Sequence, residues 1–251
     1  MSRHTSLPNT PGVAMDMDYL LVSAVIFVGA CLQGAGGVGF GMFVAPILAL
    51  WHPELVPGPL LVLGGCLAGM SAVREHQSID FKGLRYALAG RIPSSFAGSL
   101  TFSVLPVTLL SVVFAVLILL AVLLSFLGWR VTPTPRNLFT AGLASGFMGT
   151  ITSVGAPPMA IVMQNVPPAQ LRATLGAFFV VGAVISIVAL AWVGRFGLVE
   201  LKYGFALVLP LLCGFALSNQ LAARIRREHI RLLVLWMSGL AAAALLVRQL
   251  V

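Results

Sequence analysis

Charged side chains are scarce in this chain of 251 residues, because lysine, arginine, aspartate and glutamate together make up only 9% of it. Soluble domains carry about 25% charged residues, so this chain cannot cover itself with a surface suited to water. Hydrophobic residues make up 59%, and they come in long runs rather than in the alternating segments of a membrane barrel. The composition therefore predicts an all-α integral membrane protein.

Acidic residues are missing from the middle of the apolar runs. Glu54, Glu75, Asp80, Glu200 and Glu228 all fall in the connections between runs or at their ends. A carboxylate deep in a membrane is the usual basis of a proton relay or a sodium site, so we expect neither here. The histidines are peripheral as well, so any coupling to protons would depend on the substrate or on a peripheral group.

The motifs of common enzymes and metal sites are also missing. The chain has no H-E-x-x-H, no nucleophile elbow and no Walker loop, and its three cysteines, Cys31, Cys66 and Cys213, lie singly in apolar runs. We therefore expect no catalytic residue, no metal, no cofactor and no disulfide framework. The segment Gly34–Gly39 matches G-x-G-x-x-G, but it lacks the strand and the acidic residue of a dinucleotide site.

The excess of basic residues gives a formal net charge of +8 without indicating nucleic-acid binding. The arginines fall mainly in short connections between apolar runs, where basic residues set the orientation of a membrane protein. If every run crosses the membrane once, the termini share a face with Arg74, Lys82 and Arg130, which is the better cytoplasmic candidate. The cluster 224–231 then falls on the opposite side, unless the last helices are long or a broken segment re-enters and the halves are inverted.

Eight apolar runs follow one another along the chain, and a membrane span needs about 20 residues. The runs cover residues 19–50, 55–73, 84–104, 106–129, 138–162, 173–193, 201–222 and 232–250. We expect a fold of about eight helical segments in two repeated halves, each half with a broken first helix. The expected division is a flexible N-terminal tail (1–18), a first membrane repeat (19–129), a connector (130–137) and a second membrane repeat (138–251).

Two stretches rich in glycine and proline interrupt the first run of each repeat. They cover positions 33–46 and 145–158, and a shift of 112 positions superposes Gly34 on Gly146. As one straight helix the run 19–50 would reach about 48 Å, well beyond a membrane core of about 30 Å. A break or a re-entrant bend at the glycines would absorb the excess. Broken helices at matching places in two halves mark the binding site of many transporters.

We expect the two stretches to form one pocket for a small anion. Backbone groups freed by a break in a membrane helix are tolerated only where they are buried in protein or line an aqueous cavity, and the N–H groups of a helix start attract anions. The alternative is that the glycines are close-packing positions between helices. The predicted substrate-binding residues are Gln33, Gly34, Gly36, Gly37, Gly39, Ser145, Gly149, Thr150, Thr152, Ser153, Arg91 and Arg172.

Two arginines in this set would supply positive charge. Arg91 lies several residues inside a span, immediately before Ile92 and Pro93. A charge at such a place suggests a functional site by default, although a long side chain can also extend to the interface. Arg172 begins the sixth run, where it either faces substrate at a cavity mouth or marks the membrane edge. The edge is the favoured interpretation.

The two stretches resemble those of the sulfite exporter TauE/SafE family of membrane permeases. The similarity includes the segment Pro167-Pro168-Ala169-Gln170-Leu171-Arg172-Ala173-Thr174 and covers about residues 19–250. The resemblance implies a pair of repeated bundles in the bacterial inner membrane, and export of small sulfur-containing anions such as sulfite or organosulfonates. Thr152, Ser153 and Ala156 stand where glycines are common in the family, and the added hydroxyls suit a tetrahedral or pyramidal oxyanion.

The main hypothesis is a non-enzymatic secondary transporter that exports a small sulfur-containing anion by alternating access. Its partners are the anion and the lipid bilayer, with no nucleic acid, and a homo-oligomer is permitted. A membrane thiol–disulfide carrier would need cysteines at equivalent places in the repeat, which Cys31 and Cys213 do not occupy. A non-transporting membrane scaffold would have a packed centre, so an anion-accessible cavity would count against it.

Overall fold

The computed structural model describes residues 17–36, 39–127, 131–224 and 227–250, and every regular element in these ranges is helical. The predicted all-α fold is therefore confirmed. The predicted tail lies outside the described residues except for Met17 and Asp18, which begin the first helix. The helices are α1 (Met17–Gly36), α2 (Phe40–Trp51), η1 (Pro53–Leu55), α3 (Gly58–Arg74), η2 (His76–Ser78), α4 (Phe81–Val104), α5 (Val107–Leu127), α6 (Pro135–Thr152), α7 (Ala156–Val162), α8 (Pro168–Trp192), α9 (Leu198–Ala206), α10 (Val208–Arg224) and α11 (Arg227–Leu250).

Among the described residues, four helices are long and apolar enough to cross a membrane, namely α1, α5, α8 and α11, and the bent pair α9–α10 makes a fifth candidate. The bend in this pair is 41°, and it has a local cause. Pro210 would clash with the carbonyl of Ala206, four residues earlier, if the helix continued. Helices α2 and α3 are apolar but shorter, and α4 carries Lys82, Arg85 and Arg91.

The first long run is a re-entrant helical hairpin, because α2 folds back along α1. Gly29 of α1 lies against Phe40 and Val44 of α2, and the end of α2 lies beside the beginning of α1 across a cavity. The amide oxygen of Gln33 accepts a hydrogen bond of 3.0 Å from the backbone N–H of Phe40. This hairpin accounts for the excess length of the run.

The second stretch forms a shorter hairpin of the same kind. Ser145 of α6 donates a hydrogen bond of 2.6 Å to the carbonyl of Gly155, and Met159 of α7 packs in one cluster with Leu138 near the beginning of α6. The turn places Ser153 in the left-handed region with φ 61°. In the described part of the chain it is the one non-glycine residue with positive φ.

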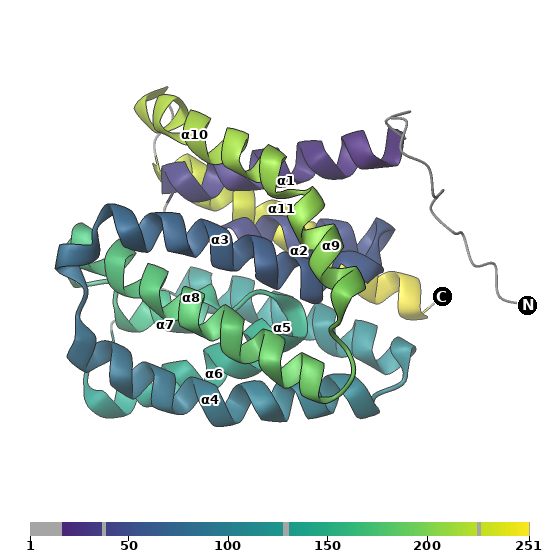
Figure 1. Ribbon diagram of the computed structural model, residues 1–251, viewed down its shortest axis with the longest axis horizontal. Helices are drawn as coiled ribbons and strands as arrows, with labels where there is room; N and C mark the ends of the chain where they lie inside the picture. The colour runs from purple at the N-terminus through teal and green to yellow at the C-terminus, as the bar shows by residue number, and fades with distance from the viewer. Residues whose placement is uncertain (1–16, 37–38, 128–130, 225–226, 251) are drawn as a thin grey trace, which may run out of the picture.

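The two hairpins point in opposite directions. Helix α10 lies parallel to α1, with Gly214 against Phe27 and Ser218 against Gly34. In the same way, α4 lies parallel to α6. Helices α3 and α8 cross antiparallel, since Gly65 lies at Ala183 and the end of α3 lies at the beginning of α8. In Figure 1 the helices lie roughly side by side, with the first turn of α1 and the last turn of α11 at the same edge.

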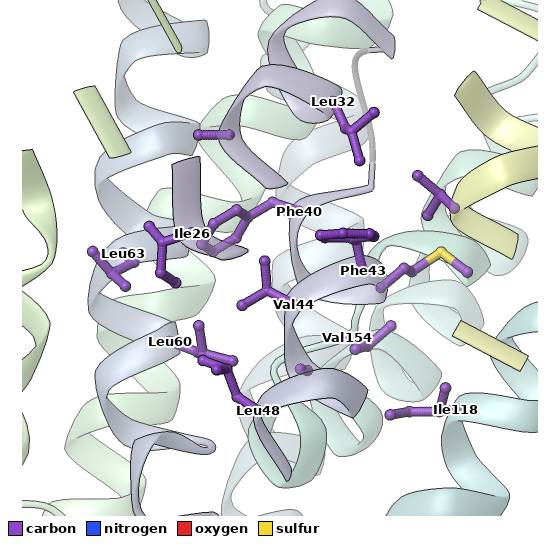
Figure 2. Close-up of a cluster of buried hydrophobic side chains, with 14 of the residues drawn as sticks. Ile26, Leu32, Phe40, Phe43, Val44, Leu48, Leu60, Leu63, Ile118 and Val154 are labelled. Atoms are coloured by element: carbon purple, nitrogen blue, oxygen red, sulfur yellow. The ribbon is translucent and has the colours of Figure 1, made fainter. Parts of the chain in front are cut away.

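The outer faces of the bundle are apolar and part of its interior is polar. Large hydrophobic residues such as Leu123 of α5, Val184 of α8 and Leu240 of α11 are exposed, as expected for a surface that faces lipid. An apolar core joins the first hairpin to α3, α5 and the second hairpin (Figure 2). Most of the buried serines and threonines of the described residues lie on α4, α6 and α8, namely Ser94, Ser95, Ser99, Ser145, Thr150, Thr152, Thr174 and Ser186.

The helix bounds relate the two breaks by a shift of 116 positions, rather than the 112 that the glycines suggested. Gly36 and Thr152 end the first arms, and Phe40 and Ala156 begin the second arms. The glycines matched in the sequence therefore lie one helical turn out of register. A four-residue difference leaves them on similar helix faces, which explains why the pattern looked coherent.

Candidate functional site

Arg91 of α4 is the one charged residue that is buried in the described part of the chain, with 2% of its surface exposed. Its Nη1 donates a hydrogen bond of 2.9 Å to Oγ of Ser145, and its Nε has no partner. No ion pair joins Arg91 to a carboxylate of the described residues. A positive charge is thus held inside the protein without a carboxylate partner among the described residues.

Helix α8 shapes the space around this guanidinium. A Cβ at position 182 would collide with Nε and Cζ of Arg91, so Gly182 provides the room that the side chain occupies. The guanidinium carbon lies 4.9 Å from the centre of the Phe178 ring and 5.9 Å from that of Phe179. Aromatic rings attract a cation within about 6 Å, so they favour the charge without neutralising it.

A central cavity of about 90 Å³ lies between the two hairpin turns, α3, α4 and α8. One water needs about 10–15 Å³ of such space, so the cavity has room for a few waters or for one small polyatomic ion. Its lining consists of Gln33, Gly39, Phe40, Gly41, Met42, Leu60, Leu61, Gly64, Gly65, Leu67, Ala68, Arg91, Gly149, Ser153, Val154, Gly155, Ala156, Phe179 and Ala183.

Of the residues predicted in the first stretch, Gln33 and Gly39 line the central cavity. Gly39 has φ 141°, a conformation that residues with a side chain rarely adopt. Gly34 packs against Ser218 of α10, as the close-packing interpretation of the glycines predicts. Gly36 is the last residue of α1, and Gly37 lies outside the described residues.

The residues predicted in the second stretch have four different positions. Gly149 and Ser153 line the central cavity, and Ser145 holds Arg91 beside it. Thr150 shares a hydrogen bond of 2.8 Å with Ser186 of α8. Thr152 donates to the carbonyl of Met148 and accepts from the N–H of Val154, so it stabilises the turn from outside the cavity lining.

Arg172 lies away from the central cavity, at the beginning of α8. Its Nη2 is 2.7 Å from the carboxylate of Glu75, and its Nε donates to both oxygens of that group at 2.9 and 3.1 Å. The pair borders a second cavity of about 40 Å³. Arg172 therefore lies apart from Arg91, although both belong to the predicted substrate-binding set.

The backbone supplies fewer free donors to the cavity than the broken-helix pattern suggested. The N–H of Phe40, first residue of α2, is already bonded to Gln33. Pro157 and Pro158 follow the first residue of α7, and proline has no N–H. Arg91 is the one charged residue among the described residues that line the cavity.

Sequence reasoning missed Gly41, Gly155, Phe179 and Gly182 as residues of this site. A Cβ at position 41 would collide with the carbonyl oxygen of Ser153, so Gly41 lets the two hairpin turns touch. Gly41 and Gly155 belong to the two glycine stretches, and that membership was the available signal. Nothing in the local sequence of α8 marks Gly182, because its role depends on a side chain 91 positions earlier.

An all-helical bundle with lipid-suited outer faces and two re-entrant hairpins around an interior cavity has the architecture of a multi-pass membrane transporter. The family model described as sulfite exporter TauE/SafE matches residues 21–245. The chain belongs to this family, and it is a membrane transporter of the sulfite-exporter type in the cell membrane. No curated protein and no solved structure shows a significant match to it.

Proposed function

We propose that this protein exports sulfite or a short-chain organosulfonate by alternating access, and that the anion binds at Arg91 in the central cavity. The observation that carries the proposal is the buried guanidinium of Arg91, which has no carboxylate partner in the described residues and borders a cavity formed by both hairpins. A charge of this kind inside a membrane is costly, so it marks a functional-site hypothesis by default.

The chemistry of the cavity supports a sulfur oxyanion. A guanidinium carries several N–H donors that can bind the oxygens of one anion. Arg91 lines the cavity, with its Nη1 bonded to Ser145 and its Nε buried against Gly182. The amide of Gln33 lies on the same cavity, as does Ser153, whose hydroxyl donates to the carbonyl of Pro57. Leu60 and Leu61 form an apolar wall. This lining suits a compact SO₃ group with no substituent or with a small alkyl group.

The opposed hairpins support the alternating-access mechanism. We propose that residues 19–129 and 138–251 are inverted repeats joined by the connector 130–137, because the helix pairs α1–α10 and α6–α4 have equivalent parallel packing. Inverted repeats allow one half to rock against the other around a fixed central site. The turns meet at Gly41 and Ser153, next to the proposed anion site.

Flux into proteoliposomes tests the proposal, with sulfite and methanesulfonate as substrates and chloride as a comparison. The unaltered protein is expected to transport at least one of the two sulfur anions. Arg91→Gln is expected to lower this flux at least tenfold, because a charged hydrogen-bonding partner contributes about 1.5–3 kcal/mol. Arg91→Lys keeps the charge without the guanidinium donors, so it should retain an intermediate rate.

Thermal unfolding in detergent provides the control for folding. Sulfite or methanesulfonate should raise the unfolding temperature of the unaltered protein, because a ligand stabilises the state that it binds, and this increase should be lost in Arg91→Gln. The proposal is wrong if neither anion is transported by a folded protein while a known anion carrier is active in parallel. Full activity of Arg91→Gln would show that the site is elsewhere.

A further inference from the structure

The second cavity lies directly beside the central one. Gln33, Ala68 and Phe179 line both cavities, so these side chains form the partition between them. The second cavity continues along α3 and α8 to Ser71, Arg74, Glu75 and Arg172. It therefore extends from the partition to the end of the bundle where α3 ends and α8 begins.

Most basic residues of the described part lie at this end of the bundle, which we call the basic end. It holds the residues at the end of α3, at the beginnings of α4, α6, α8 and α11 and at the end of α10: Arg74, Lys82, Arg85, Arg136, Arg172, Arg224, Arg227 and Arg231. The opposite end holds Arg195, Lys202 and Arg248. Basic residues are concentrated on the cytoplasmic side of membrane proteins, so the basic end faces the cytoplasm.

The described lining of the second cavity carries charges of both signs. Arg74 and Arg172 border it together with one carboxylate, that of Glu75. Arg172 is one third exposed, and its guanidinium is bonded to Glu75 through both Nε and Nη2. An anion that enters this cavity would bind the same donors, so Glu75 and the anion compete for Arg172.

We infer that the second cavity is a cytoplasmic access site, where the small sulfur oxyanion binds at Arg172 in place of Glu75 before it passes Phe179 to reach Arg91. This inference rests on the proposed function of the central cavity. It assigns Arg172 and Glu75 a role in loading the anion, in addition to the structural link that they form between α3 and α8.

Opposite effects of two substitutions test the access site. Arg172→Gln removes the donor, and it should raise the KM for methanesulfonate presented at the basic end by about tenfold. Glu75→Gln removes the competitor, and it should lower this KM severalfold. Both variants break the ion pair, so a purely structural role predicts changes in the same direction. The double variant should resemble Arg172→Gln. Without the Arg172 guanidinium, removal of the Glu75 carboxylate makes no additional donor available to the anion.

Cysteine labelling establishes which end faces the cytoplasm. In a cysteine-free background, Gln77→Cys marks the basic end and Val199→Cys marks the opposite end, and both positions are exposed. A membrane-impermeant maleimide added to intact cells should label only Val199→Cys, and inside-out vesicles should give the reverse. Labelling of Gln77→Cys in intact cells would overturn the cytoplasmic assignment.

The outcomes for the two proposals are distinct. Transport that depends on Arg91, with both KM values shifted in the same direction or unchanged, would overturn the access site alone. Absence of any sulfur-anion flux in the unaltered protein would overturn the proposed function and the access site together. Opposite shifts from the basic end, combined with the expected labelling, would support both.

Discussion

At the scale of single residues, the site depends on groups that hold one side chain in place. Ser145 bonds the guanidinium of Arg91, Gly182 leaves space for it, and Phe178 lies against it. The sequence identified Arg91 as a charge inside a span, and it left open whether the side chain extends to the interface. Burial of all but 2% of its surface removes that alternative.

Gly182→Ala is expected to displace the Arg91 guanidinium and to weaken anion binding about tenfold. The added methyl group would overlap Nε and Cζ of Arg91, which belong to a flexible side chain, so the protein should still fold. The measurement is the anion-dependent rise in unfolding temperature, together with the flux.

Gly69→Ala is the matched control on the facing helix α3. A Cβ there would lie 3.7 Å from Cγ2 of Val180, which is ordinary van der Waals contact. This variant should keep both anion binding and flux. Equal losses in the two variants would mean that α3–α8 packing, rather than the position of Arg91, explains the effect.

At the scale of the elements, the two re-entrant hairpins were partly predictable. The length of the run 19–50 required a break or a re-entrant bend, and the glycines located it. The sequence did not show that α2 turns back along α1, since that depends on contacts of Gly29 with Phe40 and Val44. It also assigned Thr150 and Thr152 to the pocket, because their hydroxyls are equally suited to bonds within and between helices.

Gly41→Ala is expected to force the two hairpin turns apart. The added methyl group would overlap the backbone carbonyl oxygen of Ser153, which is held in a tight turn and cannot rotate away. Overpacking of this kind costs about 1–3 kcal/mol, so the unfolding temperature and the flux should both fall.

Gly64→Ala is the control for Gly41→Ala, since Gly64 also borders the central cavity and a Cβ at position 64 would meet no neighbouring atom within 4 Å. Its unfolding temperature should stay near that of the unaltered protein. If Gly41→Ala unfolds at the same temperature as Gly64→Ala, the contact between the turns contributes little to stability.

At the scale of the whole molecule, composition was sufficient to predict a helical membrane protein, because scarcity of charge excludes a soluble fold. The arrangement of the halves was not accessible in this way. The orientation predicted from the basic residues depended on the assumed number of membrane crossings, because each crossing moves the following connection to the other side. The structure places the beginning of α1 at the end opposite to Arg74, because each hairpin returns to the end where it begins.

The proposed inverted repeats predict where the protein opens in its other state. The access site lies among α1, α3, α8 and α10, so its counterpart lies among α6, α8, α3 and α4 at the opposite end. There, the hydrogen bond between Thr150 and Ser186 joins two fully buried side chains. Ser186→Cys, in a cysteine-free background, should react with a small maleimide added from that end during methanesulfonate transport.

The rate of this labelling should rise with methanesulfonate and should not rise in the Arg91→Gln variant. Methanesulfonate is the substrate of choice because sulfite itself adds to maleimides. A labelling rate that is independent of substrate would contradict the exchange between two open states.

The lack of a carboxylate partner for Arg91 among the described residues has a consequence for the return half of the proposed transport cycle. An empty carrier must rearrange around a desolvated positive charge, whereas a carrier loaded with a monovalent anion encloses a neutral pair. The loaded protein should therefore change state faster than the empty one. Anions supplied on the far side would then accelerate outward flux, and exchange of one anion for another would be faster than net export.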